Sequence, residues 1–259
     1  MPELIEVEFY RQAAESAVGR RIIGIESPDA WFLKRGLDAE VLNDVVAGAR
    51  VAAARRHGKL LLVDLDGRPT IGLRFGMTGR LIVDGHAPID HLEYGSGRDD
   101  PAWDRITFHL AGGGRIRIND PRRLGGVEVE PDLSRLGPDA VTITPSQLSA
   151  ALSGSVALKA RLLDQSRVAG IGNLIADDTL WRAGLSPLRS AGSMDRAEAA
   201  RLVRQLRSAI ARLTAAGGSH TGALQAARGG GGSCPRCGGP LRREQVGGRT
   251  TIWCPRHQQ

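Results

Sequence analysis

Cysteine is scarce in this sequence, and long apolar runs are missing altogether. The 259 residues include three cysteines, all near the C-terminus, so we do not expect a disulfide framework, which would leave one thiol over. No uncharged apolar stretch approaches the roughly 20 residues that cross a bilayer, and the first residues alternate with acids instead of forming a signal-peptide core. We therefore expect a globular protein of the bacterial cytoplasm that has no membrane contact.

Lysine is also rare, because arginine supplies nearly all of the positive charge. The chain has 35 basic and 28 acidic residues, a formal charge of +7, which favours a polyanionic partner. Its lysines are Lys34, Lys59 and Lys159. Arginine clamps phosphate with two hydrogen bonds, whereas lysine is a compact charge that can also donate a proton. Lys59 and Lys159 are thus functional candidates; the alternative is that both are solvated surface charges.

The cysteines form a metal-binding pattern together with one histidine. Cys234 and Cys237 are separated by two residues, and Cys254 and His257 repeat this spacing further along the chain. Two such pairs predict a closed tetrahedral zinc site with three thiolates and one imidazole. Because four protein ligands leave no position for water, we predict one structural Zn²⁺ ion.

The second residue is a proline, and an acid follows it. Removal of Met1 would leave the secondary amine of Pro2 beside Glu3. An amine can attack a carbon with aldehyde character and form an iminium ion, which divides a difficult bond cleavage into two easier steps. The pKa of an α-amino group is roughly 7.7–8.0, so part of it is unprotonated near neutral pH. Pro2 is therefore a candidate nucleophile; alternatively it only follows the start codon, and Glu3 opens a helix.

Hydrophobic periodicity predicts an α+β protein. A helix is expected over residues 3 to about 18, and the short β-type runs that follow, separated by glycine and aspartate turns, are typical of a β-sandwich or flattened barrel: residues 22–25, 51–55, 60–65, 70–74, 81–83, 105–110, 115–118 and 127–129. Helices are expected at residues 145–152, 156–163, 173–183 and 194–216. The predicted division is a β-sandwich domain at 1–130, a linker at 131–145, a helical domain at 146–228 and a zinc hairpin at 229–259.

Two turn-rich segments are candidates for contacts with DNA. Arg122 and Leu124 lie in a turn with two adjacent arginines and an apolar tip. In a DNA-binding protein, an arginine and a wedge residue can fill the space left when a base is extruded from the duplex. Met77, between two glycines, is a second candidate wedge, although methionine is more often a core residue.

Two further segments are candidates for contacts with phosphate. Gly170 and Gly172 precede a predicted helix that starts at Asn173, and backbone N–H groups at such a start can bind phosphate. The same turn also fits two closely packed helices, and both readings hold for a helix-turn-helix. Arg249 lies between the two zinc pairs, where a hairpin pinned by metal would present it to DNA. The alternative is that the zinc segment only stabilises the C-terminus.

Taken in order, these motifs resemble the formamidopyrimidine-DNA glycosylase and endonuclease VIII family of bacterial base-excision repair enzymes. The matching segments are MPEL at 1–4, EVE at 6–8, GK at 58–59, GMTG at 76–79, DPRR at 120–123, LDQ at 163–165, AGIGN at 169–173, RAG at 182–184 and GRTT at 248–251. The opening is closer to the formamidopyrimidine branch. The resemblance implies a β-sandwich with a leading helix, a helix-two-turn-helix DNA-binding domain and a β-hairpin zinc finger.

The resemblance also implies a bifunctional enzyme, a DNA glycosylase and abasic-site lyase. Pro2 would attack C1′ of the damaged nucleotide, Glu3 would handle protons at the sugar, and Lys59 would contact phosphate and assist base departure. Glu6 matches a family acid near the active site. The iminium ion would then collapse by β- and δ-elimination. The implied DNA contacts are Met77 and Arg122 in the duplex void, with Leu124 at the wedge position, and Lys159, Asn173 and Arg249 on the phosphates beside the lesion.

The sequence departs from the family pattern at several positions. Leu124 stands where the formamidopyrimidine branch commonly has an aromatic wedge, and Ile5 replaces a usual proline. Asp178 replaces a glutamate, and His257 replaces a fourth cysteine, which zinc accepts. The glycine-rich segment 217–232 looks shorter than the base-capping loop of members that remove 8-oxoguanine. We therefore do not expect a strong preference for 8-oxoguanine.

The expected partner is duplex DNA that contains oxidised or ring-opened bases or abasic sites, bound by a monomer. One alternative is a preference for oxidised pyrimidines, as in endonuclease VIII, which the short segment 217–232 would favour. Another is a non-catalytic protein that binds damaged DNA. The presence of Pro2, Glu3 and Lys59 argues against the second alternative, because a pure binder has no need of the amine.

Overall fold

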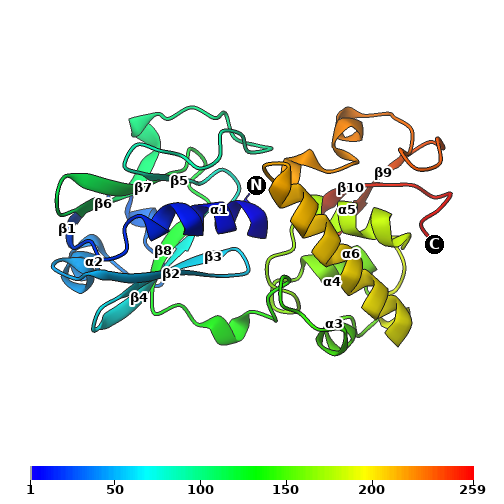
Figure 1. Ribbon diagram of the computed structural model, residues 1–259, viewed down its shortest axis with the longest axis horizontal. Coiled ribbons are helices and arrows are strands. Elements are labelled where there is room, and N and C mark those ends of the chain that lie inside the picture. Colours follow the sequence, from blue (N-terminus) through cyan, green and yellow to red (C-terminus); the bar gives the residue numbers. More distant parts are fainter. Residues whose placement is uncertain (1) are drawn as a thin grey trace. The chain divides into compact units, whose positions relative to one another are not determined.

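The computed structural model describes residues 2–259, which divide into two compact units, residues 2–133 and residues 134–259 (Figure 1). Met1 lies outside the described residues, so its expected removal stays a prediction. The first unit contains α1 (Leu4–Glu15), β1 (Ile22–Glu26), α2 (Ala39–Val46), β2 (Val51–His57), β3 (Leu60–Leu65), β4 (Arg68–Arg74), β5 (Arg80–Val83), β6 (Asp104–Leu110), β7 (Gly114–Asn119) and β8 (Gly126–Val129). The second contains α3 (Pro145–Ala151), α4 (Leu158–Leu163), α5 (Asn173–Ala183), α6 (Arg196–Ala215), β9 (Arg242–Val246) and β10 (Arg249–Trp253).

Two four-stranded antiparallel sheets form the first unit. Their strand orders are β1-β6-β7-β5 and β2-β3-β4-β8. Each of the predicted β-type runs lies within one of these strands. The α+β class and the N-terminal β-sandwich with its leading helix are therefore confirmed.

The helix α1 packs on strands of both sheets and completes the core of the first unit. Its buried residues Val7, Tyr10 and Ala14 recur every three or four positions, which puts them on one face. They share a core cluster with Leu61 of β3 and Leu81 of β5. The face that α1 buries therefore fixes the helix, and with it the residues before Leu4, against the sandwich.

The helix α2 is an element that the sequence analysis did not predict. Asp38 accepts a hydrogen bond from the Val41 N–H at 2.8 Å and so caps the helix start. Leu42 and Val46 are its fully buried residues. A helix of eight residues with two core positions gives only a weak periodic signal, so the sequence pattern does not predict it.

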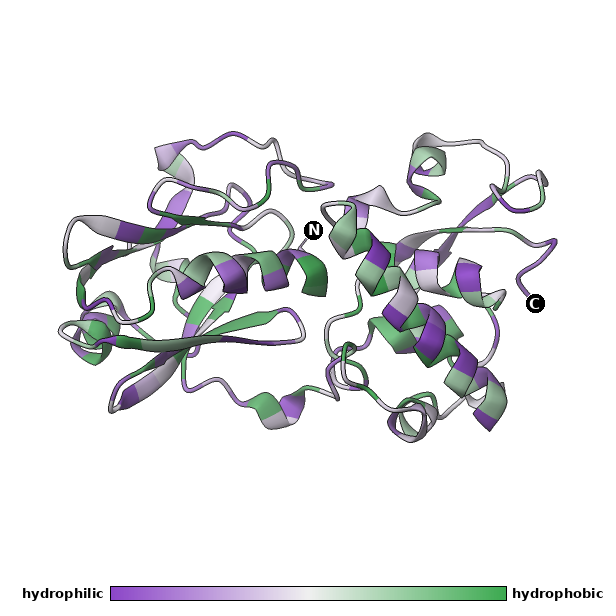
Figure 2. Ribbon diagram, viewed as in Figure 1, coloured by the Kyte–Doolittle hydropathy of each residue, from purple (hydrophilic) through white to green (hydrophobic). Residues whose placement is uncertain are grey.

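The second unit is helical and ends in the predicted hairpin. Asp195 and Glu198 form a capping box at the start of α6, whose buried stripe includes Leu202, Leu206 and Leu213. Figure 2 shows hydrophilic and hydrophobic residues alternating along this helix. The strands β9 and β10 pair antiparallel. Within residues 2–259, no helix has both the length and the apolarity that a membrane span needs.

Candidate functional site

Two buried carboxylates flank the start of α1. Glu3 is the N-cap residue of the helix and is 0% exposed, and Glu6 is 1% exposed. Glu6 Oε2 accepts the Glu3 backbone N–H at 2.8 Å, as in a capping box. The positive end of a helix dipole favours negative charge at this place. Pro2 is also buried, in a chain that still carries Met1, so its nitrogen is here part of a peptide bond.

A tyrosine on the next turn of α1 remains a proton donor beside these acids. Tyr10 Oη donates to the Gly79 carbonyl oxygen at 3.1 Å. Burial, and then the nearby charge of Glu6, raises the pKa of Tyr10 far above its usual value. The hydroxyl therefore stays protonated at neutral pH, and its hydrogen bond ties α1 to the turn that carries Met77.

Lys59 lies in the turn between β2 and β3, as its glycine neighbour predicts. Gly58 has φ +58°, which glycine adopts without strain. Arg56 Nη1 donates to the Gly58 carbonyl oxygen at 2.8 Å, and Arg56 Nε donates to Glu8 Oε2 at 3.3 Å. The end of the β2-β3 hairpin is thus fastened to α1, and the half-buried Lys59 is held with it.

Asp120 joins the two turns that were predicted to enter the duplex. This carboxylate is 0% exposed and accepts a hydrogen bond from Thr78 Oγ1 at 2.6 Å. Its other oxygen accepts the backbone N–H groups of Leu124 and Gly125, both at 2.9 Å. Sequence reasoning missed this role, although an aspartate that accepts N–H bonds further along a turn is a known turn signal. The structure therefore brings the Met77 turn and the Leu124 turn together.

The side chains of these two turns differ in exposure, and their predicted entry into the duplex stays a prediction. Leu124 is 51% exposed, Arg122 is exposed, and Met77 is half-buried. Arg123 instead makes two hydrogen bonds with the Asp29 carboxylate, at 2.6 and 2.7 Å. These hydrogen bonds lower the pKa of Asp29 against the opposing effect of burial. Arg122 is exposed as well, but within residues 2–259 no carboxylate is recorded as its partner, in contrast to Arg123.

In the second unit, Lys159 and Asn173 converge on the strand that begins with Arg249. The Thr250 carbonyl oxygen accepts Lys159 Nζ at 3.2 Å and Asn173 Nδ2 at 3.0 Å. Lys159 is 0% exposed and also donates to Thr251 Oγ1 at 2.7 Å. Arg249 itself is exposed. The phosphate contact of Lys159 stays a prediction, and its burial favours an indirect role in which it holds β10.

A buried acid balances this lysine. Asp177 is 2% exposed, and its Oδ1 lies 2.7 Å from Lys159 Nζ. Its Oδ2 accepts a hydrogen bond from Arg228 and one from the Ile252 N–H at 3.2 Å. Burial raises the pKa of Asp177, and Lys159 and Arg228 oppose that effect. The sequence analysis named neither Asp177 nor Arg228, because nothing in their spacing indicates that they meet.

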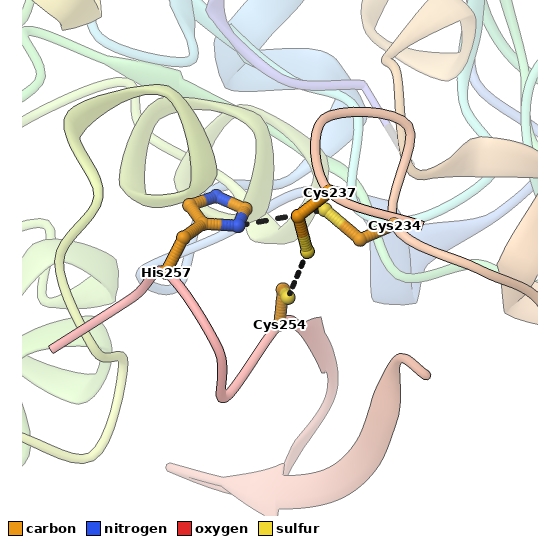
Figure 3. A group of neighbouring side chains, drawn as sticks. All are labelled: Cys234, Cys237, Cys254 and His257. Carbon is orange, nitrogen blue, oxygen red and sulfur yellow. Dashed lines mark hydrogen bonds between the residues drawn. The ribbon is translucent and has the colours of Figure 1, made fainter. Parts of the chain in front are cut away.

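The four predicted metal ligands meet at one point (Figure 3). Cys234 Sγ lies 3.5 Å from His257 Nδ1, and Cys237 Sγ lies 3.5 Å from Cys254 Sγ. All four ligand atoms lie within 4.8 Å of one another. With Zn–S bonds of about 2.3 Å, a tetrahedron has edges of about 3.8 Å. The group is therefore compact enough to hold one metal ion.

Neighbouring groups prepare these ligands for a metal. His257 Nε2 lies 3.3 Å from the Trp181 carbonyl oxygen, a contact that puts the proton on Nε2 and leaves Nδ1 free to bind. The Trp181 indole N–H donates to Cys234 Sγ at 3.3 Å. Burial raises the pKa of Cys234, but this hydrogen bond and backbone N–H groups outweigh it and bring the pKa to about 7. A thiol that ionises near neutral pH suits a metal ligand.

Comparisons with known proteins match the chain over almost its whole length. Residues 1–127 match the formamidopyrimidine-DNA glycosylase N-terminal domain, and residues 136–224 match the H2TH domain of the same family. The formamidopyrimidine-DNA glycosylases of Paracoccus denitrificans and Cereibacter sphaeroides are 33% and 34% identical, with both chains covered in full. The structure of Lactococcus lactis Fpg in complex with DNA that contains an abasic site is 25% identical, covers both chains in full and superimposes with a TM-score of 0.82.

Proposed function

This chain belongs to the formamidopyrimidine-DNA glycosylase family, and from that premise we propose that it is a bifunctional DNA glycosylase and abasic-site lyase. Its substrates are oxidised or ring-opened bases in duplex DNA, and abasic sites. The observation that carries the proposal is Pro2 directly before Glu3, the N-cap residue of α1, with the carboxylates of Glu3 and Glu6 buried at the start of this helix. An amine next to an acid is what imine chemistry at a sugar carbon requires.

The proposed reaction begins at C1′ of the damaged nucleotide. The Pro2 nitrogen, freed when Met1 is removed, forms a bond to C1′ while the bond from C1′ to the base breaks. Glu3 handles the protons at the sugar as the ring opens, and Lys59 assists departure of the base. The resulting iminium ion loses the C2′ proton and the 3′ phosphate, and a second elimination releases the 5′ phosphate. Water then hydrolyses the imine and restores Pro2.

The proposed DNA contacts follow from the need to extrude the nucleotide, because a duplex hides C1′. Flipping costs a few kcal/mol, which a damaged or mispaired base reduces. Arg122, Leu124 and Met77 occupy the gap that the nucleotide leaves. Asn173 and Arg249 bind phosphates, and Lys159 supports them by holding β10.

We also propose that the metal is one Zn²⁺ ion with a structural role. Three thiolates and one imidazole form a donor set that zinc accepts, and none of the four positions remains for water. Zinc bound by Cys234, Cys237, Cys254 and His257 would pin the β9-β10 hairpin, in which Arg249 is the first residue of β10.

A second candidate keeps the lyase chemistry and prefers oxidised pyrimidines. The observation in its favour is the segment between α6 and β9, where the only regular structure among the described residues is two short 3-10 turns, Ser219–Thr221 and Gln225–Gly229. A panel of duplexes, each with one defined lesion, separates the two. Faster release of oxidised pyrimidines than of formamidopyrimidines would favour this second candidate.

Borohydride trapping tests the proposed nucleophile. Borohydride reduces an imine to a stable amine, so wild-type protein mixed with abasic-site DNA should give a covalent complex. Mass spectrometry should place the adduct on Pro2 and show that Met1 is absent. The Pro2→Gly variant should trap far less, with its binding to uncleavable abasic-site DNA measured as the control. Equal trapping by Pro2→Gly and wild type would contradict the assignment.

A further inference from the structure

A tryptophan is exposed beside the turn that carries Arg122 and Leu124. Trp31 is 67% exposed, which makes it the most exposed large apolar side chain in residues 2–259. It lies in the short 3-10 turn Ala30–Phe32, between β1 and α2. An indole left in water contributes little to the core, so the fold gives no reason for tryptophan at this position. A ligand that stacks on the indole would explain why this position carries a tryptophan.

The backbone that carries Trp31 is rigidly fixed. Asp29 Oδ1 accepts the Trp31 backbone N–H at 3.1 Å, while the same carboxylate binds the Arg123 guanidinium. Phe32, the next residue, is 0% exposed. Because the segment is already ordered, a ligand that binds to Trp31 would not have to bear the entropic cost of ordering it.

Two consecutive glycines bring this segment against the Leu124 turn. A Cβ on Gly125 would lie 2.9 Å from Phe32 Cζ, and a Cβ on Gly126 would lie 2.5 Å from Lys34 Cε. Phe32 and Lys34 therefore occupy the space that side chains at these two positions would fill. Trp31 directly precedes Phe32, so the short turn that carries the indole lies against the backbone immediately after Leu124.

The surroundings of Trp31 carry positive charge. Lys34 Nζ lies 4.8 Å from the centre of the indole ring and donates to the Trp31 carbonyl oxygen at 2.6 Å. The nearby acid Glu128 pairs with both Arg35 and Arg74, so it does not cancel this charge. An exposed aromatic ring beside cations is the combination that binds a nucleobase and its phosphate. An acidic partner would use only the cation, and a purely apolar partner would use only the aromatic ring.

From this geometry we infer that Trp31 and Lys34 form an additional DNA contact, in which the indole stacks on a nucleobase next to the gap filled by the Arg122 turn and Lys34 faces the adjoining phosphate. The inference rests on the proposed function, since it takes the Arg122 turn as part of the DNA-binding surface. It supplies an aromatic surface to a chain in which Leu124 provides none. The substrate class is duplex DNA in which one base is left unpaired.

The test measures the affinity for a duplex with a tetrahydrofuran abasic-site analogue, which is not cleaved. Stacking on an aromatic side chain contributes about 1–3 kcal/mol per base, so Trp31→Ala should weaken binding by about 5- to 150-fold at every salt concentration. Trp31→Phe should restore most of the affinity. Lys34→Gln should flatten the dependence of binding on salt by about one phosphate contact. Ile23→Ala, which removes a side chain that is 61% exposed on β1, is the matched control and should bind like wild type.

The outcomes separate this inference from the proposed function. Because Trp31 is exposed, Trp31→Ala should melt at the wild-type temperature, so weaker binding would not reflect unfolding. Binding of Trp31→Ala within twofold of wild type would overturn the inference. If wild type nevertheless forms the borohydride adduct, the proposed function stands; if it forms none, the proposed function fails whatever Trp31 does.

Discussion

A single buried lysine shows how far residue type alone predicts a role. Lys159 attracts attention in the sequence because lysine is rare; in the structure its ammonium meets Asp177 and two groups of β10, while its phosphate contact stays a prediction. Its burial was not predictable, because it depends on α5 and β10, which are distant in sequence. The pair of Asp177 and Arg228 is separated by 51 positions and gives no local signal at all.

Removal of the Lys159 charge should destabilise the protein strongly. Lys159→Met leaves the carboxylate of Asp177 buried with one cation fewer, and breaking a buried pair costs about 3–5 kcal/mol. The free energy of unfolding, measured in urea, should fall by that amount. Arg55→Met is the control, because the Arg55–Asp64 pair lies at the surface, where a pair contributes about 0–1 kcal/mol. Equal losses for the two variants would contradict the role given to Lys159.

The pair of Asp29 and Arg123 should make the free energy of unfolding depend on pH in the acidic range. Arg123 lowers the folded pKa of Asp29, so the stabilisation is complete above the unfolded value of about 3.9 and is lost as the pH falls through the lower folded value. The difference in stability between wild type and Arg123→Gln should therefore be constant above about pH 5 and shrink toward about pH 3. Urea titrations across that range measure it. A difference that grows on acidification would show that the pair does not act in this way.

Among the elements, those that were predictable from sequence depend on local patterns. The strands of the sandwich follow from alternation and glycine turns, and the hairpin with the metal-ligand group follows from two closely spaced ligand pairs. The resemblance implies that the Met77 turn and the Leu124 turn fill the same void, but the hydrogen bonds by which Asp120 joins them were not predictable, because Thr78 and Asp120 are 42 positions apart. Local patterns thus predict the turns, whereas the side chain that holds two turns together is decided by contacts between segments that are distant in sequence.

Gly76 tests the contact between those two turns. Its φ is +57°, and a Cβ would lie 2.5 Å from the Leu124 carbonyl carbon. Gly67 has a similar φ of +63° with nothing within 4 Å, so it serves as the matched control. Gly67→Ala should cost about 1–2 kcal/mol from backbone strain alone. Gly76→Ala should cost more, because the Leu124 backbone must also move, and should weaken binding to abasic-site DNA. Equal costs would show that the two turns do not depend on each other.

At the scale of the whole molecule, the two units have separate cores, and only the second contains the metal ligands. The Cys234 and Cys254 side chains pack with Trp181 and Ile252 in a cluster of the second unit. The strand β3 lies in the sandwich core of the first. Metal binding to the folded state contributes directly to stability, so its removal should act on the part of the chain that the ligands join.

Removal of the proposed zinc ion should therefore weaken one unit and spare the other. After chelation, hydrogen exchange followed by mass spectrometry should show lost protection in β9 and β10 and in the end of α5 near Trp181, which holds two of the ligands by hydrogen bonds. Peptides from β3 should keep their protection. His257→Cys should behave like wild type because it restores a thiolate ligand, whereas His257→Ala should resemble the chelated protein. If chelation opened β3 as readily as β10, the metal would be stabilising the entire chain, and the assignment of a local structural role to the four ligands would be wrong.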